Sequence, residues 1–218
     1  MWTEKYRPKT LDEVVGNHKE IQTIKSFIEK GEVPNMLFIG PSGTGKTTVA
    51  RIIAHKLLAD TFDYNYSEFN ASDDRSLDFL RKNVVEASKF RPIGGDGRKK
   101  IILLDEADGL LQSGFELLRS PIENSKTTRI IFTANSMENF IKAITSRLTP
   151  FLFKPIEKEE MFRRLQTIAE TEGVEIDEAV LERICNQSEG DLRYAINVLE
   201  KTAITGDNEL TTILSKYQ

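Results

Sequence analysis

The sequence of 218 residues has little of what marks secreted, membrane-spanning or zinc-binding proteins. It has one cysteine, Cys185, which excludes an intramolecular disulfide and a zinc-thiolate cluster, and which we expect to be a buried thiol. No apolar run approaches the roughly 18 residues of a membrane-spanning helix, and the N-terminus lacks an apolar segment of signal-peptide length. We therefore expect an intracellular protein that binds no membrane, cytoplasmic, or nuclear if the source is eukaryotic.

Apolar residues make up 39% of the chain and charged residues 29%, enough to bury a sizeable core. The formal net charge is −4, so any nucleic-acid surface must be local. One stretch is uneven, because positions 75–100 carry eight basic and three acidic residues, a balance of +5 that leaves −9 on the rest. Such a run is most often a solvated face.

The apolar pattern alternates between strand-sized runs and helical spacing as far as Pro155, and is only helical afterwards. This alternation predicts an α/β fold in which residues 1–155 form a domain with a parallel five-stranded sheet flanked by helices, and residues 156–218 form a small all-helical domain. The predicted strands are 36–39, 66–70, 101–104, 129–133 and 151–153, and the predicted helices are 12–30, 47–58, 77–90, 115–123, 157–171, 177–187 and 191–203.

Residues 40–47, Gly-Pro-Ser-Gly-Thr-Gly-Lys-Thr, fit the phosphate-binding loop pattern GxxxxGK[ST]. They follow a predicted strand and open a predicted helix, which is the context that the pattern requires. Small residues let backbone N–H groups surround phosphate oxygens, and the helix N-terminus adds a positive dipole end. We expect Lys46 to reach the β- and γ-phosphates and the Thr47 hydroxyl to bind Mg²⁺.

Polar side chains end two other predicted strands. Asp105 and Glu106 follow the apolar run 101–104, and Asn135 ends the segment 130–135. Ligands bind at the carboxyl ends of strands in open α/β sheets. We therefore expect Asp105 to orient the Mg²⁺ shell, Glu106 to polarise an attacking water as general base, and Asn135 to lie near the γ-phosphate.

Taken together, the motifs resemble those of AAA+ ATPases, and within them those of the replication factor C small subunit of sliding-clamp loaders. The resemblance rests on Trp2–Pro8 with Leu11–Asn17, on Phe69–Arg75, on Asp105–Asp108, on Ser146-Arg147 and on Gly190–Arg193. It implies an ATPase that uses ATP and Mg²⁺ to load a sliding clamp onto primer–template DNA, beside other subunits in a pentamer.

The resemblance also assigns roles to single residues. It makes Asn135 the first sensor, Arg193 the second sensor, and Arg147 an arginine finger acting on ATP held by the neighbouring subunit. The adenine and ribose pocket would contain Tyr6, Arg7, Pro8, Val14, Val15 and Gly16; the phosphates would be held by Gly40, Pro41, Ser42, Gly43, Thr44, Gly45, Lys46, Thr47 and Thr48; and DNA would be contacted by Arg75, Arg81 and Lys82.

The chain departs from the family pattern in three ways. Leu148 stands where the family usually has cysteine after Ser146-Arg147, Ser42 stands where proline is common, and family members continue into a helical collar beyond the length of this chain. One alternative is a bacterial-type loader subunit, but those that carry a zinc module need four cysteines and this chain has one. A second is a helicase, which needs a second domain. The others are a subunit that binds ATP without hydrolysing it and another AAA+ DNA-processing ATPase.

Overall fold

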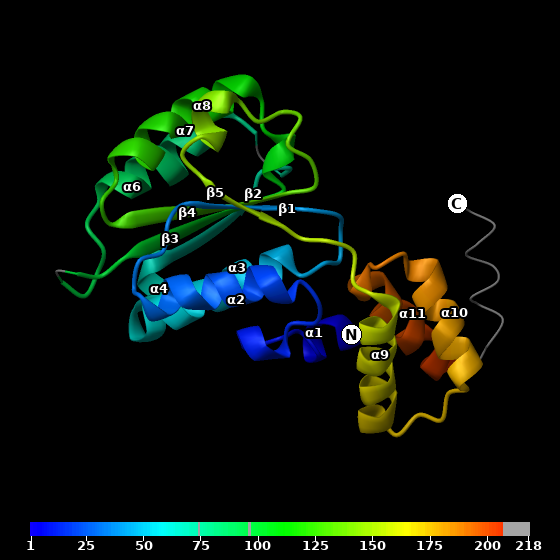
Figure 1. Cartoon of the computed structure of the whole chain (residues 1–218). Helices are drawn as coiled ribbons and strands as arrows, with labels where there is room; N and C mark the ends of the chain where they lie inside the picture. Colours follow the sequence, from blue (N-terminus) through cyan, green and yellow to red (C-terminus); the bar gives the residue numbers. More distant parts are fainter. Residues whose placement is uncertain (74, 96, 207–218) are drawn as a thin grey trace. The chain divides into compact units, whose positions relative to one another are not determined.

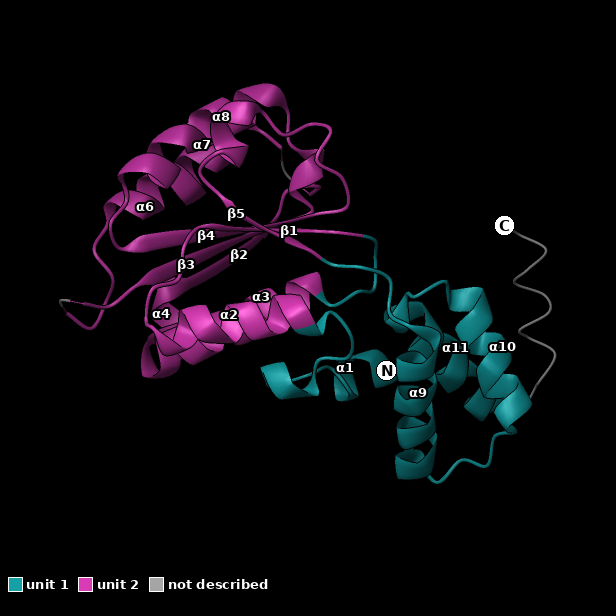
Figure 2. Ribbon diagram, viewed as in Figure 1, with its two compact units in different colours: residues 1–18, 41–45, 153–218 teal, residues 19–40, 46–152 magenta. Residues whose placement is uncertain are grey.

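The computed structural model describes residues 1–73, 75–95 and 97–206, which fall into two compact units (Figure 2). Unit 1 comprises Met1–His18, Pro41–Gly45 and the chain from Phe153 onward. Unit 2 comprises Lys19–Gly40 and Lys46–Leu152. The start of the last segment lies close to the domain boundary predicted after residue 155, whereas the first 18 residues group with the C-terminal helices.

Unit 2 is built on a parallel five-stranded sheet in the order β2-β3-β4-β1-β5. Figure 1 shows α2 and α3 on one face of this sheet and α6, α7 and α8 on the other. The predicted fold class is therefore confirmed. The strands are β1 Met36–Ile39, β2 Tyr66–Asn70, β3 Lys100–Asp105, β4 Thr128–Ala134 and β5 Thr149–Leu152, and the helices are α2 His18–Glu29, α3 Lys46–Leu58, α4 Phe62–Asn65, α5 Leu77–Leu80, α6 Ala87–Lys89, α7 Gln112–Asn124 and α8 Lys142–Thr145.

The central strands are apolar on both faces, as a sheet covered by helices on each side requires. Alternate residues of a strand point to opposite faces. Leu104 and Phe132 accordingly belong to the core cluster that contains Phe115 of α7 and Ile144 of α8. Leu103 and Ile131 are also fully buried and fall on the alternate positions. This packing on both faces holds the carboxyl ends of the strands in place.

Two predicted helices are interrupted. The range 12–30 overlaps a 3₁₀ turn at Leu11–Glu13 and then contains α2, because Gly16 and Asn17 between them have positive φ angles. The range 77–90 contains α5, a π-helical segment Arg81–Glu86 and α6. A π turn adds a residue to the helical repeat, which hydrophobic spacing alone does not reveal.

Unit 1 has its own apolar core, formed by α9 Lys158–Glu172, α10 Glu178–Ser188 and α11 Leu192–Thr205. The short helix α1 Trp2–Lys5 joins them, because Trp2 packs on this core and its backbone N–H donates to Glu200 at 2.8 Å. Cys185 is buried there, and burial raises the pKa of its thiol to about 11. Within the described ranges, no helix has both the length and the apolar character needed to cross a bilayer.

The turn between α10 and α11 depends on a glycine. Gly190 has a φ of +87°, and a Cβ there would lie 2.3 Å from Pro155 Cβ and 2.8 Å from the Ile156 backbone nitrogen. The Gly190 carbonyl also accepts a hydrogen bond from the Ile156 N–H at 3.1 Å. The turn is thereby fixed against the chain that leads into α9.

Gly190→Ala should therefore lower the free energy of unfolding by about 2–4 kcal/mol, because positive φ and a backbone clash act together. Gly173→Ala is the matched control, since Gly173 has a φ of +68° and no atom within 4 Å of a built Cβ. It should cost only about 1 kcal/mol. Urea unfolding of both variants measures the difference, and equal losses would contradict the close approach at Gly190.

Candidate nucleotide-binding site

The helix that follows the glycine-rich loop begins with Lys46 at its first position. The Lys46 side chain is only 8% exposed, and its ammonium group donates to the Gly40 carbonyl at 2.6 Å and to Asn135 Oδ1 at 3.2 Å. Gly40 follows β1 and Asn135 follows β4, and these strands are paired. The structure thus brings together three of the predicted site residues.

A second group of side chains converges on the carboxylate of Asp105, the last residue of β3. The Thr47 hydroxyl donates to Asp105 Oδ1 at 2.8 Å, and the Thr133 hydroxyl donates to the same oxygen. The register of β3 and β4 explains the second contact, because Leu104 pairs with Phe132 one residue earlier. Thr47 and Asp105, the predicted metal ligands, are therefore neighbours.

Glu106 has an unusual backbone conformation. Its φ of 54° and ψ of 42° are left-handed, which few residues other than glycine adopt. The Glu106 N–H donates to Thr133 Oγ1 at 3.1 Å, and its carbonyl accepts from the Gly109 N–H at 3.0 Å. The side chain is exposed. These bonds hold a strained backbone, a feature that clusters at functional sites.

The side-chain oxygens of Thr47 and Asp105 suit Mg²⁺. Thr47 supplies a hydroxyl and Asp105 a carboxylate, and Mg²⁺ prefers such hard oxygen ligands while keeping several waters and phosphate oxygens. The buried Lys46 ammonium lies one residue from Thr47 on the same helix turn, where it would face anionic oxygens. The residues present therefore fit a phosphate-bound magnesium ion.

The loop residues Pro41–Gly45 belong to unit 1. The Thr44 hydroxyl is buried and donates to the Pro41 carbonyl at 2.9 Å, which closes the loop on itself. A Cβ on Gly45 would lie 4.0 Å from Val14 Cγ1. Val14, predicted for the adenine pocket, therefore lies beside the phosphate loop.

The other residues predicted for the adenine and ribose pocket also lie in unit 1. The Tyr6 hydroxyl donates to Glu172, its ring packs on the core of the three helices, and Arg164 donates to its carbonyl at 2.8 Å. Desolvation and the bond to Glu172 raise the pKa of Tyr6. Gly16 would place a Cβ 2.8 Å from Ile156 Cδ1. Val15 packs on the same core, Arg7 forms an ion pair with Glu4, and Pro8 is half-buried.

The two arginines with predicted catalytic roles belong to different units, Arg147 to unit 2 and Arg193 to unit 1. Arg147 Nε lies 2.6 Å from Glu123 Oε1 of α7, and Arg147 Nη1 donates to the Ala143 carbonyl at 2.6 Å. Arg193 is exposed in the first turn of α11 in unit 1. The arginine-finger role of Arg147 and the sensor role of Arg193, which the resemblance assigns, stay predictions.

The three residues predicted to contact DNA are exposed on one short stretch of unit 2. Arg75 precedes α5, and Arg81 and Lys82 open the π-helical segment. Arg81 Nη1 lies 2.9 Å from Asp78 Oδ1. Such an exposed pair contributes only about 0–1 kcal/mol, so Arg81 remains able to exchange Asp78 for another anion.

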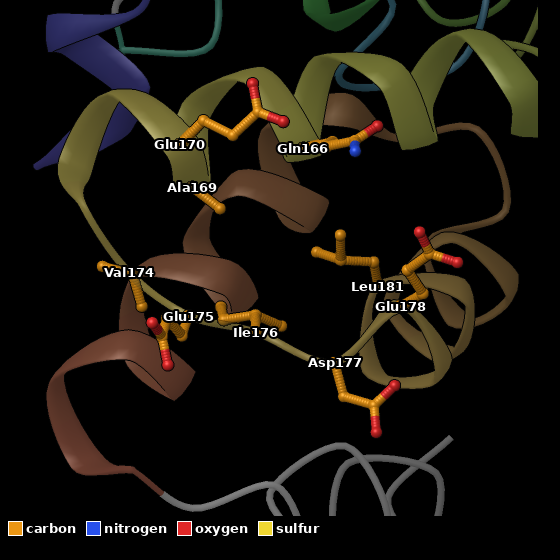
Figure 3. A pocket seen from close by; sticks show the side chains of 9 residues that line it. All are labelled: Gln166, Ala169, Glu170, Val174, Glu175, Ile176, Asp177, Glu178 and Leu181. Atoms are coloured by element: carbon orange, nitrogen blue, oxygen red, sulfur yellow. The ribbon is translucent and has the colours of Figure 1, made fainter.

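A pocket of about 450 Å³ lies elsewhere in unit 1 (Figure 3). Its lining includes four carboxylates, and Figure 3 shows these side chains together with apolar ones such as Ile176 and Leu181. Nucleotide phosphates would be repelled there, and none of the predicted site residues lines it. The lining residues are Gln166, Ala169, Glu170, Val174, Glu175, Ile176, Asp177, Glu178 and Leu181.

Comparison with known proteins agrees with this geometry. Residues 36–156 match the family described as "ATPase family associated with various cellular activities (AAA)", and residues 163–204 match the "RCF1/5-like, AAA+ ATPase lid domain". The replication factor C small subunit of Archaeoglobus fulgidus is 45% identical over 208 residues, which are 95% of this chain and 65% of that protein. The protein of the same name from Methanococcus vannielii is 38% identical over 216 residues, 99% of this chain and 68% of that protein.

The chain belongs to the family of replication factor C small subunits, within the AAA ATPases. It spans about 65% of the length of the Picrophilus torridus and Archaeoglobus fulgidus relatives. Among solved structures, the Thermotoga maritima RuvB Holliday junction branch migration motor has a TM-score of 0.72 at 23% identity, covering 89% of this chain and 64% of that one. This second likeness supports the AAA fold alone.

Sequence reasoning missed Thr133, which in this family member joins Asp105 to the Glu106 backbone. A threonine inside a strand is an ordinary β-former, so only its place opposite Asp105 in the sheet marks it. That place follows from the strand order, which hydrophobic patterning does not determine.

Thr133→Val keeps the shape of the side chain but removes the hydroxyl. The Glu106 N–H then loses its partner, so we expect a loss of about 1–3 kcal/mol in the free energy of unfolding. We also expect the Mg²⁺ concentration for half-maximal ATPase activity to rise, because Asp105 loses an orienting donor. Thr133→Ser keeps the hydroxyl, so its free energy of unfolding and its Mg²⁺ requirement should be close to those of the wild type. If Thr133→Val matched the wild type in urea unfolding and magnesium titration, the hydrogen bonds of the Thr133 hydroxyl to Asp105 and Glu106 would contribute neither to stability nor to magnesium binding.

Proposed function

We propose that this chain is the ATP-binding and ATP-hydrolysing part of a clamp-loader subunit, which drives loading of a sliding clamp onto primer–template DNA inside the cell. The observation that carries the proposal is the shared hydrogen-bonding of Thr47, Asp105, Thr133 and the Glu106 backbone. It supports hydrolysis because it joins a phosphate-loop residue to the group expected to activate water. Membership of the replication factor C family supports the biological setting.

The residues of the site have separate roles in binding and hydrolysing ATP. Lys46 holds the β- and γ-phosphates with its ammonium group, and the amide of Asn135 positions the attacking water. Glu106 accepts the proton of that water through its exposed carboxylate. Mg²⁺, when bound by Thr47 and Asp105, neutralises charge on the phosphates. Tyr6 and the other predicted pocket residues bind the base, and Arg193 contacts the nucleotide of its own subunit.

A subunit that binds ATP without hydrolysing it is the second candidate. It would need no group to activate water and no restraint on that group's backbone. Here Glu106 is present, its left-handed backbone is held by Thr133, and its side chain is exposed. These features favour hydrolysis over binding alone.

Measuring ATPase activity of the chain alone, then with primed DNA, then with DNA and a clamp tests the proposal. Activity should rise at each step, because the clamp loader works on both partners. Glu106→Gln keeps the size of the side chain but removes the base, so it should bind ATP normally and lose nearly all turnover. Turnover at the wild-type rate in that variant would remove Glu106 from the mechanism, and activity indifferent to DNA and clamp would point to another ATPase.

Arg147 is proposed to act on the ATP of a neighbouring subunit, where an arginine contributes about 10³–10⁵ in rate in other systems. Arg147→Ala should leave ATP affinity unchanged and remove the part of the activity that rises with protein concentration. Arg119→Ala is the matched control, because Arg119 Nη2 also lies near Glu123, at 4.0 Å. Equal activity of Arg147→Ala and wild type at every concentration would leave Arg147 as a structural ion-pair residue.

The DNA surface is proposed to include Arg75, Arg81 and Lys82. Replacing all three by glutamine should weaken binding to any DNA sequence. It should also reduce the log–log salt slope by roughly 0.9 for each phosphate of duplex DNA that the variant no longer neutralises. A matched triple replacement of the exposed residues Arg163, Arg183 and Lys201 in unit 1 removes the same charge elsewhere. If both triple variants changed the slope equally, the effect would reflect net charge and not a surface.

A further inference from the structure

The phosphate loop has a negatively charged neighbour in unit 1. The carboxylate of Asp191 lies so close to Gly43 that a Cβ on Gly43 would fall 1.8 Å from Asp191 Oδ1 and 2.2 Å from its Cγ. Gly43 also has a φ of +67°. Any side chain at position 43 would therefore have to displace Asp191, so the loop and the carboxylate form one packed contact.

Asp191 is held on its other side by α11. It is the N-cap of that helix, and its Oδ1 accepts a hydrogen bond from the Tyr194 N–H at 2.8 Å. Its own N–H donates to the Ser188 carbonyl at 2.7 Å. The side chain therefore cannot turn away from the loop without giving up the cap of the helix that carries Arg193.

A fixed carboxylate beside a loop that surrounds phosphates acts against the positive end of the helix dipoles. Like charges a few ångströms apart repel, and the repulsion weakens with exposure and salt. We propose that Asp191 is a positioning residue that limits the nucleotide affinity of the phosphate loop through its negative charge. The inference rests on the proposed function, since it requires that this loop hold nucleotide phosphates.

The test is the affinity for ADP and for the slowly hydrolysed analogue ATPγS, both with Mg²⁺, measured by calorimetry at about 50 and 500 mM salt. Asp191→Asn and Asp191→Ser remove the charge and keep an N-cap side chain. Both should lower Kd by about three- to tenfold at low salt, with a smaller change at high salt. A merely structural role would not produce this salt dependence.

Asp177→Asn is the matched control, because Asp177 caps α10 by accepting from the Ala179 N–H at 3.0 Å. It should change Kd less than twofold, and thermal unfolding should show that all variants are folded. Unchanged or weaker binding by both Asp191 variants, while the wild type binds nucleotide, would overturn this inference alone. A wild type that binds neither nucleotide would overturn the proposed function and this inference with it.

Discussion

Parallel pairing of β1, β3 and β4 places the carboxyl ends of three strands at one edge of the sheet, and the chemistry of unit 2 depends on this placement. Asp105 ends β3, Thr133 lies opposite it near the end of β4, and Gly40 follows β1. The paired strands are packed on both faces, and a one-residue shift of their register would move Asp105 away from Thr133. The positions of Asp105 and its two hydroxyl donors are therefore fixed by the core.

Two glycines of unit 1 lie where segments distant in the sequence make close contact. At Gly43 and at Gly190, the absent side chain is what allows two distant segments to touch, the phosphate loop with Asp191 and the α10–α11 turn with Pro155. The first contact involves Asp191 itself, and the second involves Gly190, the residue before it. The conformation of the phosphate loop and the start of α11 are therefore coupled through a few packed atoms.

The strands were the most predictable part of the fold. β1 and β2 have the bounds that the sequence indicates, because short apolar runs end at turn-forming residues. The four-residue helices α1, α4 and α8 were not predicted, since one turn carries no apolar period. Within the site, the phosphate loop and Asp105 have local motifs. Thr133 and the contact of Asp191 with Gly43 do not, because each depends on segments that meet only in the folded chain.

The ion pair of Arg147 and Glu123 is compatible with an arginine that acts elsewhere. Both side chains are about one-third exposed, at 37% and 33%, and pairs of this kind contribute little to stability after screening. An arginine buried with its partner would leave an unpaired charge behind if it moved, which is costly. Here the solvent can replace Arg147 around Glu123, and Arg119 lies close to the same carboxylate. The pair therefore restrains the direction of Arg147 without preventing its release from Glu123, which the proposed arginine-finger role requires.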